Sequence, residues 1–438
     1  MNKFLFWSLS VALAGFLFGF DIVVISGADK TLQVLWHSPD MFHGFVVMGS
    51  ALWGTVIGAI FGGIPTNAFG RKNTLIAIGI LFLVSSVGSA FANDPWLFAF
   101  FRLIGGLGIG ASTIAAPAYI SEISPAKSRG RLVAMYQLSI VTGILVAFLS
   151  NYVLNDSGPD AWRWMLGVGA FPAAVYVIMI LLVPESPRWL VMKGRLEAAR
   201  AVLRKVDPRL DFQQYVASLG PVESKQKESI FSSKYSRATL LVFFIAFFNQ
   251  LSGINAFLYY SPRIFEGAGL GSDSAFLSSV GVGVVNVVFT LVGMALIDRL
   301  GRKQLMFIGS VGYILSLGLV TLSFLQGWGG LAVAVFFFVF IASHAIGQGT
   351  VIWVFIAELF PTHLRASGQA FGSTVHWVLA ALIPSLIPML FETVGAGAVF
   401  GFFGVMMVGQ LAWVFLKMPE TKGETLEAVS ARLSESGR

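Results

Sequence analysis

Two charged side chains lie inside apolar segments that are long enough to cross a bilayer. Asp21 is part of the string GFDIVVISG at residues 19–27, and Arg102 is part of FRLIGG at residues 101–106. A charge in the hydrocarbon core costs about 2.5 kcal/mol or more, so each one needs a partner or a function. A carboxylate beside a guanidinium stays ionised, but when it is separated from it in a dry environment it takes up a proton. An Asp21–Arg102 pair that forms and breaks is therefore a candidate proton carrier, and a permanent structural ion pair is the alternative.

Polar carboxamides gather in the apolar segment near residues 238–260. This segment contains Asn249, Gln250 and Asn255, with Tyr259 four positions further on. Unsatisfied amides facing lipid would be costly, so we expect these side chains to line a cavity. An amide donates and accepts hydrogen bonds at once, which suits a neutral cargo that is rich in hydroxyl groups. Side chains on other spans that are candidates to complete such a site are Gln137, Asn286, His376 and Trp353, whose indole offers an apolar plate with one N–H donor.

Two histidines, His344 and His376, also fall inside apolar segments. A histidine in a membrane can relay protons, but a neutral histidine that only forms hydrogen bonds is the commoner case. The region contains no paired carboxylates, metal-ligand pattern or phosphate-binding loop. The sequence therefore does not favour an enzyme.

The composition and the apolar segments predict the elements that position these residues. Of the 438 residues, 56% are hydrophobic and 12% are charged, whereas soluble domains carry about 25% charged residues. Segments of about 20 apolar residues, each able to cross the hydrocarbon core as a helix, lie near residues 4–25, 44–67, 74–92, 96–120, 132–154, 162–183, 238–260, 274–297, 305–325, 331–357, 366–390 and 396–416. The first is too long for a secretory signal peptide and is expected to be retained. The expected fold is an all-α membrane protein with twelve transmembrane helices in two pseudo-symmetric six-helix bundles.

Short charged motifs occur twice along the chain at nearly the same offset. GRK at residues 70–72 recurs at 301–303, ExxPxxxR at 122–129 recurs at 358–365, and PES at 184–186 recurs as PET at 419–421. A shared offset indicates a duplicated half. The expected domains are therefore an N-terminal bundle over 1–183, a linker with short helices over 184–237, a C-terminal bundle over 238–416 and a tail over 417–438. Two similar halves in an apolar chain predict a site between them.

The basic residues predict the orientation in the membrane. The polar linker carries 11 Lys or Arg, and if it is cytoplasmic, only four of the 29 Lys and Arg lie elsewhere: Lys30, Arg163, Arg263 and Arg102. Such an asymmetry is the positive-inside signal, so both termini are expected in the cytoplasm. The net charge of +7 arises from these anchors and does not indicate nucleic-acid binding. The absence of cysteine excludes disulfides and thiol chemistry.

These strings closely resemble the sugar porter family of the major facilitator superfamily, and the resemblance covers essentially the whole chain. Besides GFD…ISG and FR…GG, the matching strings are PxYxSExxPxxxRG at 117–130, PESPRW at 184–189, Q…GIN…YY at 250–260, DxxGRK at 298–303 and PETKG at 419–423. By this resemblance, Asp21 and Arg102 match the proton-coupling pair of symporters. Facilitative relatives typically carry Asn at the position of Asp21, which favours symport.

The resemblance also implies a sugar site and a gating network. The implied substrate-binding residues are Phe18, Gln137, Asn249, Gln250, Asn255, Tyr259, Asn286, Trp353, His376 and Trp377, with Gln348 as an additional ligand. The implied cytoplasmic network, which holds the outward-open state, comprises Arg71, Lys72, Glu122, Arg129, Glu185, Arg188, Asp298, Arg302, Glu358, Arg365 and Glu420. If the basic residues were positive-inside anchors only, the repeated Glu residues would have no explanation.

Some positions depart from the family pattern. Asn67 stands where the first-half motif normally has Asp, and Asn249 and His376 replace common Gln or Asn residues. The tenth span reads GQGTVIW at 347–353, where relatives often carry proline. These departures affect the first-half network, gating and the choice of sugar.

The function expected from the sequence is a proton-coupled monosaccharide symporter that works by alternating access. The alternatives are an uncoupled facilitative uniporter of the same fold and, more remotely, a non-transporting sugar sensor. The expected partners are a monosaccharide and the lipid bilayer, with no nucleic acid and a functional monomer. The expected coupling ion is the proton, without any other cofactor, and the expected location is the cell (inner) membrane.

Overall fold

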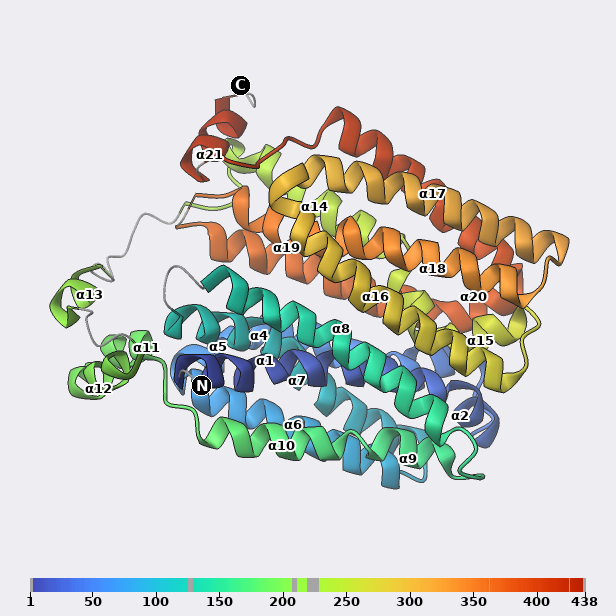
Figure 1. Ribbon diagram of the computed structural model, residues 1–438. Coiled ribbons are helices and arrows are strands. Elements are labelled where there is room, and N and C mark those ends of the chain that lie inside the picture. The colour runs from blue at the N-terminus through green and yellow to red at the C-terminus, as the bar shows by residue number, and fades with distance from the viewer. Residues whose placement is uncertain are drawn as a thin grey trace. The chain divides into compact units, whose positions relative to one another are not determined.

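The structure is a computed structural model, and it describes residues 3–124, 129–206, 211–218, 228–361, 363–424 and 426–435. Every regular element in these ranges is a helix (Figure 1). The chain forms two compact units, and each is described below by itself. The first unit comprises Met1–Ile22, Ser50–Ala147 and Arg163–Lys227, and the second comprises Val23–Gly49, Phe148–Trp162 and Glu228–Arg438.

The first unit contains most of the helices of the first half of the chain. They are α1 (Lys3–Val24), α4 (Ser50–Phe61), α5 (Gly63–Ala68), α6 (Arg71–Phe91), α7 (Pro95–Ile123), α8 (Arg129–Leu154), α9 (Ala161–Gly167), α10 (Ala170–Leu181), α11 (Pro187–Met192), α12 (Leu196–Val206) and α13 (Phe212–Ser218). The ends of α1 and α8 and the start of α9 belong to the second unit. Asp94 caps α7 by accepting hydrogen bonds from the backbone N–H groups of Trp96 and Leu97, both at 3.0 Å.

Glycines let α4 and α7 approach each other closely. A Cβ on Gly54 would lie 2.2 Å from the carbonyl oxygen of Leu103, and one on Gly106 would lie 2.0 Å from that of Ala51. Small residues at such interfaces allow helix backbones to pack tightly in a membrane. The GxxxG pattern of α4 is therefore used for packing.

The second unit contains the helices of the second half and two segments from the first half. Its helices are η1 (Ile25–Gly27), α2 (Asp29–Leu35), α3 (Asp40–Phe42), η2 (His43–Met48), η3 (Ser233–Tyr235), α14 (Ser236–Leu251), α15 (Ile254–Gly267), α16 (Ser272–Leu300), α17 (Arg302–Gln326), α18 (Gly330–Ile346), α19 (Gln348–Glu358), α20 (Arg365–Leu416) and α21 (Leu426–Glu435). Two predicted spans are broken in their middle, between α14 and α15 and between α18 and α19. Irregular backbone at membrane depth is tolerated where it is buried in protein or lines a cavity.

The predicted number of crossings is confirmed. Among the described residues, ten helical segments are long and apolar enough to span a membrane, and the bent pair Asp40–Met48 with Ser50–Phe61 adds another. One of the ten, Arg365–Leu416, has 52 residues and contains Gly395 with the non-helical angles φ 81° and ψ 154°. The predicted spans 366–390 and 396–416 meet at this glycine, so this single segment accounts for two crossings.

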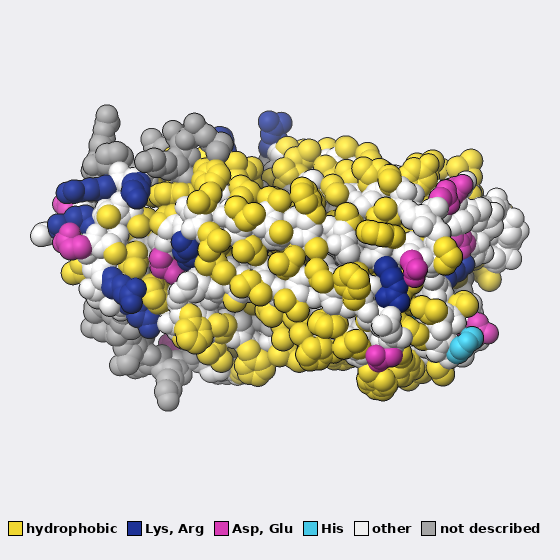
Figure 2. Space-filling view, turned by 90° about the horizontal axis from the view of Figure 1, so that it is seen from below, with side chains coloured by type: hydrophobic (Ala, Val, Ile, Leu, Met, Phe, Trp, Pro, Cys, Tyr) yellow, Lys and Arg dark blue, Asp and Glu magenta, His cyan; other side chains and the backbone are white. Residues whose placement is uncertain are grey.

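The flanks of the helices expose large apolar side chains. Phe171 is 74% exposed, Leu331 is 74% exposed and Val405 is 68% exposed. Figure 2 shows hydrophobic side chains over the flanks of the helices and charged side chains near the helix ends. A soluble protein would not leave so much apolar surface uncovered, whereas lipid covers it in a membrane.

Candidate functional site

The predicted charge pair exists in the first unit and is buried. Arg102 on α7 donates from Nη1 to Asp21 Oδ1 on α1 at 2.6 Å, and from Nη2 to the backbone carbonyl oxygen of Asp21 at 2.9 Å. Asp21 is 5% exposed and Arg102 is 1% exposed. The guanidinium therefore holds both the side chain and the main chain of Asp21.

The second carboxylate oxygen of Asp21 is not used. Oδ2 is buried and has no hydrogen-bond partner among the described residues. Buried polar atoms of proteins nearly always have a partner, so an exception indicates an unseen ligand or a chemical role. Because Oδ1 is bonded to Arg102 and Oδ2 has no described hydrogen-bond partner, the carboxylate can accept a proton on Oδ2 while it keeps its contact with Arg102.

The predicted carboxamides meet at the break between α14 and α15 in the second unit. Gly253 has φ 81°, and a Cβ there would lie 2.4 Å from the ring of Phe403, so only glycine fits. Asn255 Nδ2 donates to Gln250 Oε1, and Gln250 Nε2 donates to Asn249 Oδ1, each at 2.8 Å. Asn249 and Gln250 are buried, while Asn255 is half-buried. At this break, the side chains of Asn249, Gln250 and Asn255 form one hydrogen-bonded group, in which Asn255 is the only one that is partly exposed.

An aromatic group lies against these amides. Gln250 Nε2 is 3.2 Å from His376 Nδ1, and the ring of His376 lies 5.1 Å from that of Trp353 and 5.0 Å from that of Trp377. His376 and Trp353 are half-buried and Trp377 is buried. This arrangement offers hydrogen-bonding groups beside an apolar ring face, the combination that a pyranose requires.

The other predicted ligands are not all part of this group. Phe18 and Gln137 lie in the first unit, on α1 and α8. In the second unit, Tyr259 is fully buried on α15, and Asn286 on α16 accepts from Thr290 Oγ1 at 3.5 Å. Gln348 is also fully buried and bonds Asn249 rather than facing an opening.

His344 has a local partner. Its Nδ1 forms a hydrogen bond with the hydroxyl of Tyr313 on α17. Both expectations for His344, a proton relay and a neutral hydrogen-bonding group, involve a contact of this kind.

The first copy of the repeated charges forms the first motif cluster, made by Arg71, Glu122, Glu185 and Asn67. Arg71 donates from Nε and Nη2 to the two oxygens of Glu122, both at 3.0 Å, and from Nη1 to Asn67 Oδ1 at 3.3 Å. Glu185 accepts the backbone N–H of Arg71 at 3.0 Å and that of Lys72 at 3.1 Å. A carboxylate at the start of a helix is stabilised by these N–H groups and by the helix dipole.

The second motif cluster, made by Arg302, Glu358, Glu420 and Asp298, repeats the arginine contacts and the helix cap of the first. Arg302 donates to the two oxygens of Glu358 at 3.1 and 2.8 Å and to Asp298 Oδ1 at 3.4 Å. Glu420 accepts the backbone N–H groups of Arg302 and Lys303, both at 3.0 Å. Asn67 therefore keeps the position and the hydrogen bond of Asp298 but lacks its charge.

The glycine before each arginine is required by the backbone and by space. Gly70 has φ 99° and Gly301 has φ 93°, a region that favours glycine. A Cβ would lie 2.1 Å from an oxygen of Glu185 in the first case and 2.5 Å from one of Glu420 in the second. Any side chain would push the carboxylate away from the start of its helix.

The pKa values of the two capping carboxylates are shifted in opposite directions. Burial raises the pKa of Glu185 above its ordinary value, although backbone hydrogen bonds and Arg71 oppose it. Burial acts in the same direction on Glu420, but hydrogen bonds from four backbone N–H groups outweigh it and lower the pKa. The second cluster thus stabilises the ionised carboxylate more strongly.

Three predicted members of the network stand apart from the described clusters. Arg188 is exposed on α11 and forms no hydrogen bond or ion pair with a described residue. Arg365 begins α20, and its Nε has no partner in the described part of the chain. The side chain of Arg129 lies outside the described residues.

The second unit holds a buried charged group that the sequence did not predict. Asp29 accepts from His43 Nε2 at 2.8 Å and forms an ion pair with Arg263 Nε at 2.7 Å. Lys30 and Glu266 form a second ion pair beside it. These contacts join the segment after α1 to α15. In the sequence, Asp29 and His43 stand before the predicted span 44–67 and could have been noticed as candidates for a charged group. Their pairing depends on tertiary structure and could not be inferred.

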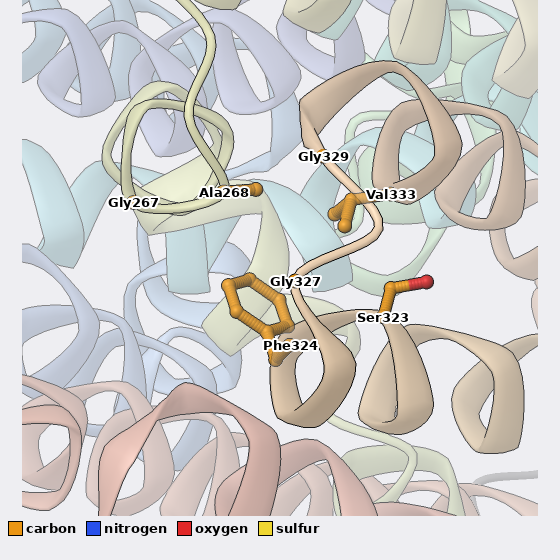
Figure 3. Close-up of a pocket in the computed structure, with 7 residues that line it drawn as sticks. All are labelled: Gly267, Ala268, Ser323, Phe324, Gly327, Gly329 and Val333. Atoms are coloured by element: carbon orange, nitrogen blue, oxygen red, sulfur yellow. The ribbon is translucent and has the colours of Figure 1, made fainter.

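A small cavity near the ends of α15 and α17 does not resemble a sugar site (Figure 3). Its volume is about 120 Å³, and it is lined by Gly267, Ala268, Ser323, Phe324, Gly327, Gly329 and Val333. Ligand pockets usually measure about 300–1,000 Å³ and place several polar groups around the ligand. No group of three or more His, Asp or Glu suited to a metal ion occurs among the described residues.

The fold and these sites define a polytopic helical transporter of the major facilitator type. Its structure resembles that of the xylose transporter XylE from E. coli in a partially occluded inward-open conformation, with a TM-score of 0.86, 30% identity, and coverage of 97% of this chain and 100% of the other. XylE bound to 6-bromo-6-deoxy-D-glucose gives a TM-score of 0.79 at 30% identity, covering 99% and 100% of the two chains. The model of the family described as sugar (and other) transporter matches residues 7–433. The chain belongs to this family, and it is a transporter rather than an enzyme.

Curated relatives agree with this assignment. The probable metabolite transport protein CsbC of Bacillus subtilis is 36% identical over 97% of this chain and 93% of its own length. The arabinose-proton symporter of the same species is 33% identical, over 96% and 93%. The D-xylose-proton symporter of Escherichia coli K12 is 31% identical, over 97% and 94%.

Proposed function

We propose that this protein is a proton-coupled monosaccharide symporter that works by alternating access. The observation that carries the proposal is Asp21, a buried carboxylate with one oxygen on Arg102 and the other oxygen open. Two relatives that match nearly the whole chain are named as pentose–proton symporters, which supports the same assignment. The family resemblance supports it too, because by that resemblance facilitative relatives typically carry Asn at the position of Asp21.

The chemistry assigned to Asp21 is a reversible protonation. A proton that binds Oδ2 neutralises the carboxylate and removes its Coulomb attraction for Arg102. The Nη2 bond from Arg102 to the Asp21 backbone carbonyl does not depend on this charge, so the guanidinium keeps a partner. The transport cycle then alternates between two states of Asp21. In one, the carboxylate is ionised and paired with Arg102; in the other, it is neutral and less strongly bound to Arg102, and a conformational change of the protein converts one state into the other.

The sugar is assigned to the open side of the amide group. Asn255, His376 and Trp353 are half-buried and would contact the sugar directly, with Gln250 directly behind Asn255. Phe18 and Gln137 remain ligands that the family resemblance implies, and they lie in the first unit. The proposed location is the cell (inner) membrane, with both termini in the cytoplasm and a functional monomer.

Replacement of Asp21 by Asn tests the coupling. Asn keeps the size and the Arg102 contact but cannot carry a proton. In proteoliposomes with an inward proton gradient, Asp21→Asn is expected to abolish uphill sugar accumulation while counterflow exchange continues. The measurement is uptake of labelled D-xylose and D-glucose with and without a protonophore.

The control is Asp273→Asn at the exposed start of α16, which should accumulate sugar as the wild type does. Undiminished concentrative uptake by Asp21→Asn would rule out symport through this residue. Wild-type protein that equilibrates sugar without any sugar-induced pH change would instead be a uniporter.

A further inference from the structure

The amide group continues deep into the second unit as a directed chain of hydrogen bonds, here called the amide relay. Asn255 donates to Gln250 at 2.8 Å, Gln250 to Asn249 at 2.8 Å and Asn249 to Gln348 at 3.3 Å. Gln348 Nε2 donates to Gln410 Oε1 at 2.7 Å, and Gln410 Nε2 donates to Ser310 Oγ at 2.8 Å. In every link, the residue nearer to Asn255 is the donor and the residue nearer to Ser310 is the acceptor.

The direction is determined at the buried end. Ser310 Oγ has a single proton, and it donates this proton to the carbonyl oxygen of Met306 at 2.7 Å. While it does so, its hydroxyl accepts from Gln410, which presents its NH₂ group to Ser310 and its oxygen to Gln348. The same argument passes from each amide to the next, so one hydroxyl orients five carboxamides.

Reversing an amide in this chain would be costly. Ser310, Gln348 and Gln410 are all 0% exposed, Gln250 is 1% exposed and Asn249 is 3% exposed. A flipped amide would place N–H against N–H and oxygen against oxygen, and no water could compensate for the loss. A buried polar group without its partner costs more than the hydrogen bond itself contributes.

The open end of the relay is Asn255. Its NH₂ group is engaged with Gln250, and its Oδ1 accepts from no described residue. Gln250 uses one N–H on Asn249 and directs the other at His376. The relay therefore presents a fixed acceptor at Asn255 Oδ1 and fixes the orientation of the buried Gln250 amide behind it. An acceptor in a fixed position can distinguish sugars by the placement of their hydroxyls.

We propose that Ser310, Gln410 and Gln348 are positioning residues that set the sugar selectivity of this transporter by fixing the orientation of the Gln250 and Asn255 amides. They lie on three elements, α17, α20 and α19, and all three are 0% exposed, so in this proposal they act without contacting the cargo. Gln348, expected from the sequence to be a ligand, acts in this proposal through Asn249. The inference rests on the proposed function, in which these amides bind a monosaccharide.

The test removes the hydroxyl that sets the direction. In Ser310→Ala, the Gln410 amide can flip and exchange the positions of its oxygen and NH₂ group, so the orientation of the other amides is no longer fixed. We therefore expect the dissociation constants for D-xylose and D-glucose to rise about three- to tenfold and by different factors. The matched control is Ser316→Ala in the same helix, where a buried hydroxyl bonds only the backbone carbonyls of Gly312 and Tyr313. This control should bind both sugars as the wild type does.

Two further variants separate the relay from simple packing. Gln410→Met keeps the volume of the side chain without its hydrogen bonds, and the double variant Ser310→Ala, Gln410→Met should bind no more weakly than Gln410→Met alone. Ser310→Thr retains a hydroxyl that can donate to the preceding turn, so it should restore the wild-type ratio of the two constants. This rescue distinguishes a lost orientation from lost stability, and thermal unfolding is measured for each variant.

The possible failures are distinguishable. If Gln250→Ala abolishes binding but Ser310→Ala and Gln410→Met keep the wild-type affinities and ratio, the relay proposal is wrong and the proposed function remains. If Gln250→Ala itself binds both sugars normally, the proposed sugar site is wrong. Additive effects in the double variant would likewise overturn the relay.

Discussion

At Asp21 the two oxygens of one carboxylate have different environments, and this difference is visible only in the structure. The sequence predicted the pairing with Arg102, because two isolated charges in apolar spans must find each other or remain unpaired at high cost. It could not predict that Arg102 also binds the backbone carbonyl of Asp21. That second bond depends on how α1 and α7 are rotated, which no residue pattern specifies.

The residues of the amide relay were only partly predictable. Asn249, Gln250 and Asn255 lie within one predicted span, so it could be inferred that they share a face of that span. Gln410 and Ser310 lie 160 and 60 positions from Gln250 and are single polar residues in apolar spans. A lone polar side chain in a span signals a buried contact, but its partner becomes evident only when the helices are packed.

The two helix-capping glutamates should respond differently to neutralisation. At pH 7, Glu420→Gln is expected to lower the thermal unfolding temperature more than Glu185→Gln does, because backbone hydrogen bonds hold the pKa of Glu420 down whereas burial raises that of Glu185. A depressed carboxyl pKa contributes stability above the unfolded pKa and loses it as the pH falls. A raised pKa has the opposite effect, since the folded state then holds its proton more tightly.

Unfolding temperatures measured from pH 4 to pH 7 check this expectation. The difference between wild type and Glu420→Gln should shrink as the pH falls. The loss caused by Glu185→Gln should also become smaller, but in the opposite direction, as the pH rises through the raised pKa and the wild type loses the stability of the protonated carboxyl. Equal losses at every pH would contradict the assignment.

Among the elements, the broken helices matter most for the site. The sequence predicted the apolar spans well, because hydrophobic length is a local property. It predicted separate spans at 366–390 and 396–416, which meet at the non-helical Gly395, but it did not predict that Gly347 would end α18 in the middle of a span. Breaks of this kind depend on what the neighbouring helices supply to the freed backbone groups.

The break at Gly253 can be tested directly. Gly253→Ala forces a side chain into a left-handed conformation and against the Phe403 ring, so we expect a loss of about 1–3 kcal/mol of stability and weaker sugar binding. The control is Gly267→Ala in α15, where an added Cβ meets no atom within 4 Å and φ is not positive. Unfolding temperature and sugar dissociation constants measured on both variants decide the matter, and equal behaviour would contradict a requirement for glycine at 253.

For the whole molecule, the repeated motifs were the most productive signal in the sequence. A shared offset implied two related halves, and in both motif clusters the arginine donates to the two oxygens of a glutamate. The assignment of Val23–Gly49 to the second unit was not predicted. In the structure Asp29 of this segment contacts His43 and Arg263, and from the sequence such single charges near helix ends are equally compatible with solvent-exposed anchors.

The orientation of the chain can be checked because it contains no cysteine. Ser157→Cys, in the exposed stretch after α8, should react with a membrane-impermeant maleimide added to intact cells. Arg195→Cys, in the exposed stretch between α11 and α12, should react only after the membrane is opened. The reverse pattern would invert the proposed topology, and the unmodified protein provides a blank without background labelling.

The motif clusters have one more consequence, which concerns the covalent continuity of the chain. The hydrogen bonds of the first cluster join residues between 67 and 185, and those of the second join residues between 298 and 420. None of them needs the peptide bonds between Ser218 and Glu228. If the gene were divided at that point, it would encode two polypeptides. The first would contain all residues of the first motif cluster, and the second would contain all residues of the second motif cluster. Fragment complementation therefore becomes a practical way to vary one half of this transporter while the other is left untouched.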